Sequence, residues 1–245
     1  MAELHGLVLA GGEGSRLAGG GVPKPLVRVA GRPQLVHLIE TLAGLGCPSV
    51  TCLVRDDFGA AVADVERRRW AVPVGFHACH TPSSLHTLAE GFARLPAGAA
   101  FVTMVDTVMR PQDWRDLYAA ARASLDAGSD AVLAVTPFVD DEAALYVSTD
   151  AGGRVRRLSA APLEPVSVTG GAYAFAAGVR PLATEAVADG VARMRNFLAR
   201  LVDRGHVVTA VSVPRIIDLD RPSDLEAANA WLAGKGEDRS VRGGT

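Results

Sequence analysis

Short apolar, β-branched runs alternate with amphipathic stretches along the first part of the chain. The apolar runs have the length of strands and comprise Leu7–Ala10, Val50–Val54, Val72–Phe76, Ala100–Val105 and Ala131–Thr136. The stretches between them have the length of helices and comprise Gln34–Leu45, Gly59–Arg69, Ser84–Leu95 and Gln112–Ala127. Because parallel strands need long crossover connections, this alternation predicts an α/β fold with a Rossmann-like, mixed and mostly parallel sheet flanked by helices.

The pattern changes after about residue 140. Three short strand-like runs separated by turn residues predict a small antiparallel addition, and they are Leu145–Ser148, Val155–Leu158 and Gly171–Phe175. Farther on, Arg195–Arg204 is predicted as a helix, Val207–Val213 as a strand, and Ser223–Leu232 as a helix that begins after Pro222. We expect a single domain over residues 1–233 and a flexible tail over residues 234–245.

The charge of the chain limits the partners that it can attract. A net charge of −2 and a pI near 6.3 provide no basic field, so we expect neither nucleic acid nor an anionic membrane as a partner. No basic, apolar leader and no run of about 18 apolar residues occurs, which predicts a cytoplasmic protein without a membrane segment. Cys47, Cys52 and Cys79 lack C-x-x-C spacing and are expected to be buried, reduced thiols. The sequence leaves the oligomeric state open, a homo-oligomer included.

Gly11, Gly12 and Gly14 directly follow the first predicted strand. Ligands of open α/β sheets bind beyond the carboxyl ends of the strands, and glycines let successive backbone amides converge on one phosphate. Arg16 adds a charged, bidentate donor. A tight strand-to-helix turn would be the structural explanation of the same glycines. A dinucleotide-binding fingerprint is disfavoured, because it would require glycine at the position of Leu17.

Lys24 lies between Pro23 and Pro25, whereas a Walker loop requires its lysine between glycine and Ser or Thr. The two prolines restrict the backbone on both sides of the lysine. They predict an ammonium group that projects from a stiff loop toward the glycines. Taken alone, such a lysine is ordinarily a solvated surface charge, and only the neighbouring glycine loop makes it a candidate catalytic residue.

Three carboxylates are candidates for a Mg²⁺ site. Asp106 follows a predicted strand and would stand at the same sheet edge as the glycine loop, although capping a turn is its structural alternative. Asp218 and Asp220 alternate with apolar residues on a predicted short strand and would share one face. Mg²⁺ binds through one or two carboxylates and keeps water and phosphate oxygens, so Asp218 is preferred as the second ligand and Asp220 follows it. Asp224 is interpreted as a first-turn acid of the helix after Pro222.

Three segments together resemble the signature of the sugar-1-phosphate nucleotidylyltransferases, in the short form without a C-terminal β-helix domain. They are Leu9–Leu17, Pro23–Leu26 and Val29–Pro33, which match L-A-G-G-x-G-[ST]-R-[LM], P-K-P-L and V-x-G-x-P. The resemblance implies a glycosyltransferase-A-like nucleotidyltransferase fold, with a nucleotide-binding part at about residues 1–137 and an acceptor-binding part at about residues 138–215. It also implies that a nucleoside triphosphate and a sugar 1-phosphate react to give an NDP-sugar and pyrophosphate.

The resemblance implies roles for individual residues. Arg16, Lys24 and Asp106 would be catalytic, and Asp106, Asp218 and Asp220 would hold Mg²⁺. The nucleotide-binding positions would be Leu9, Ala10, Gly11, Gly12, Glu13, Gly14, Ser15, Arg16, Thr81, Ser83 and Ser84. The last three belong to a segment where the family contacts the nucleobase, and an ordinary helix N-cap is their structural alternative. His77 and His80 are too isolated to indicate a metal site.

The acceptor side departs from the family at one point. Residues 169–173 resemble the acceptor strand of the family, and the acceptor-binding candidates are Thr107, Gly170, Gly171, Arg157 and Arg195. The two glycines could also mark a β-bulge. Many relatives carry an E-K-P lysine that neutralises the acceptor phosphate, whereas residues 156–162 contain no lysine here. Arg156 or Arg157 could replace it, or the acceptor could differ from a hexose 1-phosphate.

Three other functions stay open at this point. A cytidylyltransferase for a non-sugar phosphate such as phosphocholine would have an equally short chain, and a molybdopterin guanylyltransferase would share the glycine loop and the lysine. A non-catalytic nucleotide sensor would keep the fold, but the loss of Arg16, Lys24 or Asp106 would be expected in it, and all three are present. The catalytic alternatives share a nucleoside triphosphate and a phosphorylated small-molecule acceptor as partners, and the sequence specifies neither the base nor the acceptor.

Overall fold

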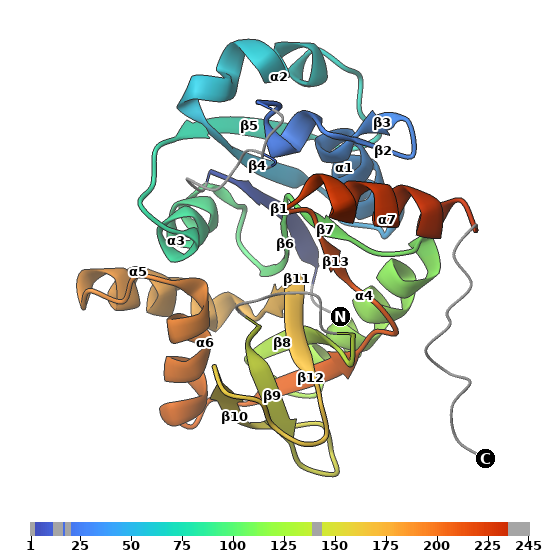
Figure 1. The fold of residues 1–245 in the computed structure, drawn as a ribbon. Helices are drawn as coiled ribbons and strands as arrows, with labels where there is room; N and C mark the ends of the chain where they lie inside the picture. Colours follow the sequence, from blue (N-terminus) through green and yellow to red (C-terminus); the bar gives the residue numbers. More distant parts are fainter. Residues whose placement is uncertain (1–2, 12–16, 18–20, 139–143, 235–245) are drawn as a thin grey trace, which may run out of the picture.

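A mixed sheet forms the centre of the molecule (Figure 1). The computed structural model describes residues 3–11, 17, 21–138 and 144–234, and its main sheet has nine strands within these ranges. Four neighbouring strands are parallel, in the order β5-β4-β1-β6. They are β1 (Leu4–Ala10), β4 (Val50–Arg55), β5 (Val74–Cys79) and β6 (Ala99–Met104). The predicted α/β fold is confirmed, and its strand order reverses at β1.

The remaining strands of the sheet are arranged around β11 (Val168–Phe175), which runs antiparallel to β6 and to β8. They are β8 (Ala131–Thr136), β9 (Tyr146–Thr149), β10 (Val155–Ser159) and β12 (Val208–Ser212). β8 and β12 pair in parallel, and β9 and β10 form an antiparallel pair at the sheet edge. The expected antiparallel addition is therefore present. The register of β11 against β8 shifts between Thr169 and Tyr173, which is the kind of irregularity that the two glycines of this strand suggest.

Each strand sends alternate side chains to the two faces of the sheet, and helices cover both faces. In β1, Val8 and Ala10 belong to one core cluster, whereas Leu7 and Leu9 belong to the other. The first cluster includes side chains from α1 (Gln34–Gly44), α2 (Gly59–Glu66) and α4 (Pro111–Asp126). The second includes side chains from α3 (Ser84–Arg94), α5 (Arg180–Ala188) and α6 (Met194–Asp203). Two-sided coverage explains why the central strands consist of nearly continuous apolar residues.

α7 (Pro222–Leu232) packs over a third and smaller core (Figure 1). Two short ladders contribute to this core, β2 (Arg28–Val29) with β3 (Arg32–Pro33) and β7 (Thr107–Val108) with β13 (Ile217–Asp218). The guanidinium groups of Arg110 and Arg215 lie 4.9 Å and 5.5 Å from the ring of Trp231. These contacts fix the last described helix next to the segment that follows β6.

Several boundaries differ from the prediction for physical reasons. The third strand begins at Val74 and not at Val72, because Pro73 has no N–H to donate to a ladder. β11 begins at Val168, ahead of its two glycines, and not at Gly171. The helix α5 was not predicted, because its nine residues show only a weak apolar periodicity. The four two-residue strands are too short to leave an alternating pattern in the sequence.

Two predicted segments fall outside the described residues. They are the part of the glycine loop that contains Gly12, Glu13, Gly14, Ser15 and Arg16, and residues 235–245 of the predicted tail. Across the described ranges, no helix combines the length and the apolar character needed to span a bilayer.

Candidate active site

A cavity of about 410 Å³ lies beyond the carboxyl end of β6, next to the strand-order reversal at β1. Distant parts of the chain line it: Pro82, Ser83, Ser84, Met104, Asp106, Leu145, Thr169, Gly170, Gly171, Tyr173, Arg193, Met194, Arg195, Leu198, Asp218 and Asp220. Open α/β sheets bind their ligands at this kind of position. The structure therefore brings the three candidate metal ligands together with Ser83, Ser84, Gly170, Gly171 and Arg195.

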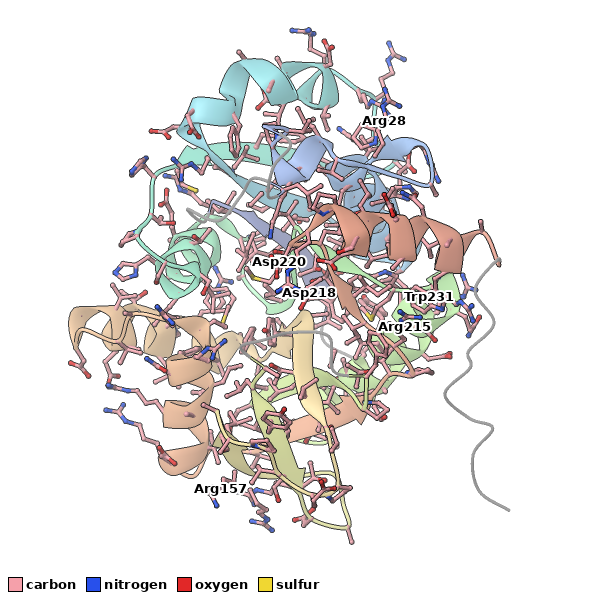
Figure 2. All side chains as sticks on the ribbon, in the orientation of Figure 1. Arg28, Arg157, Arg215, Asp218, Asp220 and Trp231 are labelled. Carbon is pink, nitrogen blue, oxygen red and sulfur yellow. The ribbon has the colours of Figure 1, made fainter. Side chains whose placement is uncertain are left out.

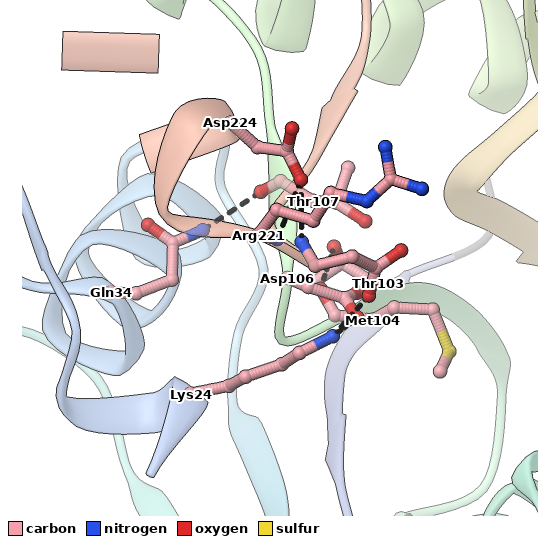
Figure 3. Close-up of polar contacts among 9 residues, drawn as sticks. Lys24, Gln34, Thr103, Met104, Asp106, Thr107, Arg221 and Asp224 are labelled. Atoms are coloured by element: carbon pink, nitrogen blue, oxygen red, sulfur yellow. Dashed lines mark hydrogen bonds and ion pairs between the residues drawn. The ribbon is translucent and has the colours of Figure 1, made fainter. Parts of the chain in front are cut away.

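Lys24 reaches the acidic wall of this cavity from a separate loop. It begins the one-turn helix η1 (Lys24–Leu26), and only 6% of its side chain is exposed. Its Nζ donates hydrogen bonds to Asp106 Oδ2 at 2.9 Å and to Asp220 Oδ1 at 2.6 Å (Figure 3). The ammonium group is thus turned inward, toward these two carboxylates.

Lys24 carries its charge despite this burial. Removal from water would by itself lower the pKa of the ammonium group. The negative charge of Asp106 and the hydrogen bonds to both carboxylates act in the opposite direction, and together they raise the pKa of Lys24 above its ordinary value. The group is therefore a fixed cation at neutral pH, held between two anions.

Backbone hydrogen bonds tie the two acidic segments to each other. Asp106 directly precedes β7, and β13 pairs with β7 so that Asp218 lies opposite Thr107. The N–H of Leu219 then donates to the carbonyl oxygen of Asp106 at 3.0 Å. The strand ends at Asp218, so the prediction that Asp220 continues the same strand is wrong, although both carboxylates line the cavity. The N–H of Asp220 instead donates to the carbonyl oxygen of Asp218 in a turn.

Asp224 holds the turn that carries Asp220. One of its carboxylate oxygens, Oδ2, accepts hydrogen bonds from the N–H groups of Asp220 at 3.0 Å and Arg221 at 2.7 Å. It therefore caps the N-terminus of α7, where Pro222 opens the helix (Figure 3). The structural role that the sequence suggested for Asp224 is confirmed.

The donor set of the cavity suits Mg²⁺ better than a metal held by protein alone. No group of three or more His, Cys, Asp or Glu side chains that could hold a metal ion occurs in the described ranges. Asp106 and Asp218 nevertheless line one cavity. Mg²⁺ needs only one or two carboxylates when substrate phosphates and water complete its coordination. These two residues thus fit a metal that arrives with a phosphorylated substrate.

Gly170 and Gly171 are required by close packing. A Cβ atom at residue 170 would lie 2.3 Å from Ile216 Cδ1, and one at residue 171 would lie 2.0 Å from Thr107 Oγ1. Thr107 is fully buried, its carbonyl accepts a hydrogen bond from Gln34 Nε2 at 2.8 Å, and it is absent from the cavity lining. Its side chain thus positions β11 against the Asp106 segment, whereas the backbone of the two glycines faces the cavity.

The nucleotide-side candidates lie around the end of β1 and the start of α3. Leu9 and Ala10 are buried at the end of β1, and Gly11 follows them. Ser83 caps α3 by accepting from the N–H of His86, and Ser84 Oγ accepts from the N–H of Met194 at 3.3 Å. Thr81 is buried behind the cavity wall and bonds to Thr87. Of the three predicted base contacts, the structure places Ser83 and Ser84 at the cavity and Thr81 behind it.

The candidate arginines of the acceptor side lie in two different places. Arg195 lines the cavity at the start of α6 together with Arg193. Arg157 is exposed on β10 at the sheet edge, far from Asp218 and Asp220 (Figure 2). Arg156, on the same strand, forms an ion pair with Asp150. The arginines that line the cavity thus come from the start of α6 and not from the stretch that aligns with the family's lysine.

Arg193 and Tyr173 are among the lining residues that were not singled out from the sequence as site residues. Arg193 belongs to an R-x-R pattern at the start of a predicted helix, which could have marked it. Tyr173 is buried, and this burial, reinforced by the negative charges of Asp218 and Asp106, raises the pKa of its phenol well above the ordinary value. The phenol stays protonated at physiological pH and presents an O–H group beside the carboxylates.

Known proteins resemble this chain in both sequence and fold. The sequence profile of the MobA-like NTP transferase domain matches residues 6–204. The bifunctional protein GlmU of Azorhizobium caulinodans is 34% identical over 135 residues, which cover 54% of this chain and 29% of GlmU. The chain therefore matches less than a third of the length of that relative.

Two solved structures share the fold over nearly the whole chain. The inositol-1-phosphate CTP transferase from T. maritima has a TM-score of 0.76 at 19% identity, covering 96% of both chains. A putative glucose-1-phosphate thymidylyltransferase from Bacillus anthracis, in complex with a sucrose, has a TM-score of 0.78 at 17% identity and covers 99% of this chain and 98% of its own. At these identities the two structures establish the fold.

Proposed function

Because the chain belongs to the family of MobA-like NTP transferase domains, we propose that it transfers a nucleotidyl group from a nucleoside triphosphate to a sugar 1-phosphate. The products would be an NDP-sugar and pyrophosphate. The observation that carries this proposal is the distribution of charge around the cavity. Lys24 lies against Asp106 and Asp220 on one wall, and Arg193 and Arg195 stand at the start of α6 on another. A reaction between two phosphates needs one cation at the point where they react and further cations that bind the acceptor phosphate.

The reaction requires no general base, because the acceptor phosphate is already an anion. One of its oxygens attacks the α-phosphorus in line, and the bond from that phosphorus to the bridging oxygen breaks. The electron pair of that bond leaves with pyrophosphate. Catalysis then consists of holding both phosphates in line and offsetting the charge that develops between them.

The residues of the site divide this work. Lys24 would donate to the phosphate oxygens at the reacting α-phosphorus, and the amides of the loop that begins at Gly11, with Arg16, would hold the triphosphate. Arg193 and Arg195 would bind the acceptor phosphate in place of the family's lysine. Asp106 and Asp218 would hold Mg²⁺, which when bound would offset negative charge on the triphosphate.

Support for the acceptor class comes from the named neighbours. One is named for inositol 1-phosphate with CTP and the other for glucose 1-phosphate with a thymidylyl group. Both acceptors are phosphorylated polyols, although the bases differ. The acceptor-side lysine of the family is missing, and Arg157 lies far from the cavity. Both observations favour a non-sugar phosphate such as phosphocholine as the second candidate acceptor.

A pyrophosphate-release assay tests the proposal. The four ribonucleoside triphosphates and dTTP are crossed with sugar 1-phosphates, inositol 1-phosphate and phosphocholine, with Mg²⁺ and with EDTA. We expect release in at least one Mg²⁺-containing combination. Asp106→Asn and Asp218→Asn should abolish it, and Lys24→Ala should lower it by on the order of 100- to 1,000-fold.

The matched control is Asp116→Asn, which removes a carboxylate from the exposed surface of α4, where its partner is Gln112. This variant should keep the activity of the parent. Nucleotide binding without release in any combination would instead identify a non-catalytic sensor. Full activity in Asp106→Asn would refute the site.

A further inference from the structure

We infer that Asp220 is a positioning residue that holds Lys24 on Asp106 in the metal-free protein, and that Lys24 and a divalent cation compete for Asp106. This inference rests on the proposed function, because it concerns the metal and the phosphates that this function requires. It differs from the role expected from sequence, in which Asp220 is itself a metal ligand.

The first support is the placement of the ammonium group. Lys24 Nζ lies 2.9 Å from Asp106 Oδ2 and 2.6 Å from Asp220 Oδ1, so its shorter contact is to Asp220. The exposed fractions of the side chains are 6% for Lys24, 21% for Asp106 and 60% for Asp220. The lysine therefore bridges a recessed carboxylate, which the proposed function assigns to the metal, and an outer carboxylate in contact with solvent.

The second support is the rigidity of the backbone that presents Asp220. Asp224 accepts from the N–H groups of Asp220 and Arg221 (Figure 3). Leu219 donates to the backbone carbonyl of Asp106. The distance between the two carboxylates is thus set by the β7–β13 ladder and the α7 cap. A carboxylate built into such a frame can hold the lysine in one orientation.

The third support is the amino-acid composition. The chain contains 25 Lys and Arg residues, and only Lys24 and Lys235 among them are lysines. An ammonium group is a compact point charge with three donors, whereas a guanidinium group is a planar fork. The three donors of Lys24 can bond to two carboxylates and one phosphate oxygen at the same time. The planar fork of arginine does not suit this arrangement, so the site favours lysine.

Competition follows from charge. A metal ion that binds Asp106 meets an ammonium group already in contact with one oxygen of that carboxylate, and the two cations repel each other at such short range. Metal binding therefore weakens the contact between Asp106 and Lys24, while Asp220 keeps the lysine in place. One or more N–H donors of Lys24 then become available to a phosphate. Because coupling is reciprocal, a phosphate that takes up Lys24 makes Asp106 a better metal ligand.

The first experiment measures Mn²⁺ binding to the full chain without nucleotide, from the EPR signal of free Mn²⁺. Lys24→Met should bind Mn²⁺ at least roughly tenfold more tightly than the parent, because the competing cation is removed. The double variant Lys24→Met/Asp220→Asn should keep this gain to within about threefold. Asp116→Asn should bind like the parent. Circular dichroism confirms that each variant is folded.

The results that overturn the inference are specific. Unchanged or weaker Mn²⁺ binding in Lys24→Met would show that Lys24 and the metal do not compete for Asp106. A return of the double variant to the affinity of the parent, or below it, identifies Asp220 as a metal ligand and removes its positioning role.

A second experiment uses the unaltered chain, in case Lys24→Met does not fold. With lysine labelled by ¹³C at Cε, the NMR spectrum contains two lysine signals, from Lys24 and Lys235. Mg²⁺ without nucleotide should shift the Lys24 signal and leave that of Lys235 unchanged, relative to NaCl at equal ionic strength. A Lys24 signal that stays in place at saturating Mg²⁺ overturns the inference. Neither experiment measures turnover, so absent pyrophosphate release would contradict the proposed function alone.

Discussion

Gly11 occupies a position that leaves no room for a side chain. A Cβ atom there would lie 2.4 Å from Cys79 Sγ and 3.0 Å from Thr87 Cγ2, and all three residues are buried. The glycine thus brings the end of β1 directly against the end of β5 and the start of α3. This close packing, and not only backbone freedom, explains the first of the three glycines that follow β1.

The substitution Gly11→Ala should therefore destabilise the protein by about 1–3 kcal/mol, because the added methyl group overpacks the site. Urea denaturation followed by circular dichroism measures the change. In a double-mutant cycle, Cys79→Ala should recover part of the loss, because it removes the closest atom. Gly44→Ala is the control, since nothing lies within 4 Å of the added Cβ, and it should be neutral or slightly stabilising. Equal losses at both glycines would contradict the packing argument.

Lys24 makes a second prediction at the residue scale, on alkaline stability. Its pKa is raised in the folded protein, so the folded state holds this proton more tightly than the unfolded chain does. The stabilisation is complete below the unfolded pKa of about 10.5 and is lost as the pH rises through the higher folded pKa. Raised pKa values of Tyr118 and the buried cysteines also lower stability at alkaline pH, but this effect is equal in the parent and in a Lys24→Met variant.

The free energy of unfolding of the parent should therefore fall more steeply than that of Lys24→Met as the pH rises above about 10. Below about pH 9 the difference between the two proteins should be constant. Urea denaturation at a series of pH values measures it. A difference that does not narrow at alkaline pH would show that the ion pairs of Lys24 contribute nothing to stability.

At the scale of elements, Arg180 joins α5 to the end of α3. Its guanidinium group donates to the carbonyl oxygens of Phe92, Leu95, Pro96 and Gly98, with distances of 2.9 Å to Leu95 and 2.5 Å to Pro96. Phe92 and Leu95 belong to the end of α3, where a helix leaves its last carbonyl groups without intrahelical partners, and Pro96 and Gly98 belong to the connection that follows. One side chain thus satisfies the C-terminus of the helix whose N-terminus lies at the cavity.

Arg180→Met should destabilise the protein by about 1–3 kcal/mol, because several partly buried carbonyl groups lose their donor. The midpoint of urea denaturation measures this change. Arg115→Met is the matched control, since Arg115 bonds only to the side chain of Gln112 on the exposed face of α4, and it should change stability by less than about 0.5 kcal/mol. If the two variants are equally stable, α5 does not depend on this contact.

Local patterns explain which elements could be predicted. β8 has the predicted boundaries, and α1, α3 and α4 begin or end within a residue of theirs, because apolar periodicity and helix-starting residues are local signals. The helix α5 lacks such a signal and depends on its contacts with α3, including those of Arg180. The ladder between β7 and β13 joins residues more than 100 positions apart, and no local pattern predicts that pairing.

At the scale of the whole molecule, the main sheet brings separate parts of the cavity wall together. β11 lies between β6 on one side and β8 and β9 on the other. It therefore places Gly170 and Gly171 beside the Asp106 segment. The sequence predicted that Asp106 would stand at the same sheet edge as the glycine loop, because carboxyl ends of parallel strands meet there, and the family resemblance added Asp218 to the same site. It could not predict the ion pairs of Lys24 with Asp106 and Asp220, because they join residues 82 and 196 positions apart. It could not predict the remote position of Arg157 either, because that position depends on the order of the strands beyond β11.

The cavity thus has an acidic side, formed where β6 and β13 end, and a basic side at the start of α6. The cations of α6, Arg193 and Arg195, line the cavity, whereas Arg157 lies at the outer edge of the sheet (Figure 2). If the acceptor phosphate binds at α6, Arg193→Ala and Arg195→Ala should each raise the KM for the acceptor by on the order of tenfold, because a charge-assisted hydrogen bond is lost.

The KM for the nucleoside triphosphate should change little in either variant, because the proposed function assigns its phosphates to the opposite side of the cavity. Arg157→Ala, which removes the same kind of side chain from β10, is the control and should match the parent in both constants. Steady-state kinetics with each substrate varied in turn provide the measurement. A rise in the acceptor KM of Arg157→Ala, with no rise for the α6 variants, would return the acceptor phosphate to the strand where the family carries its lysine.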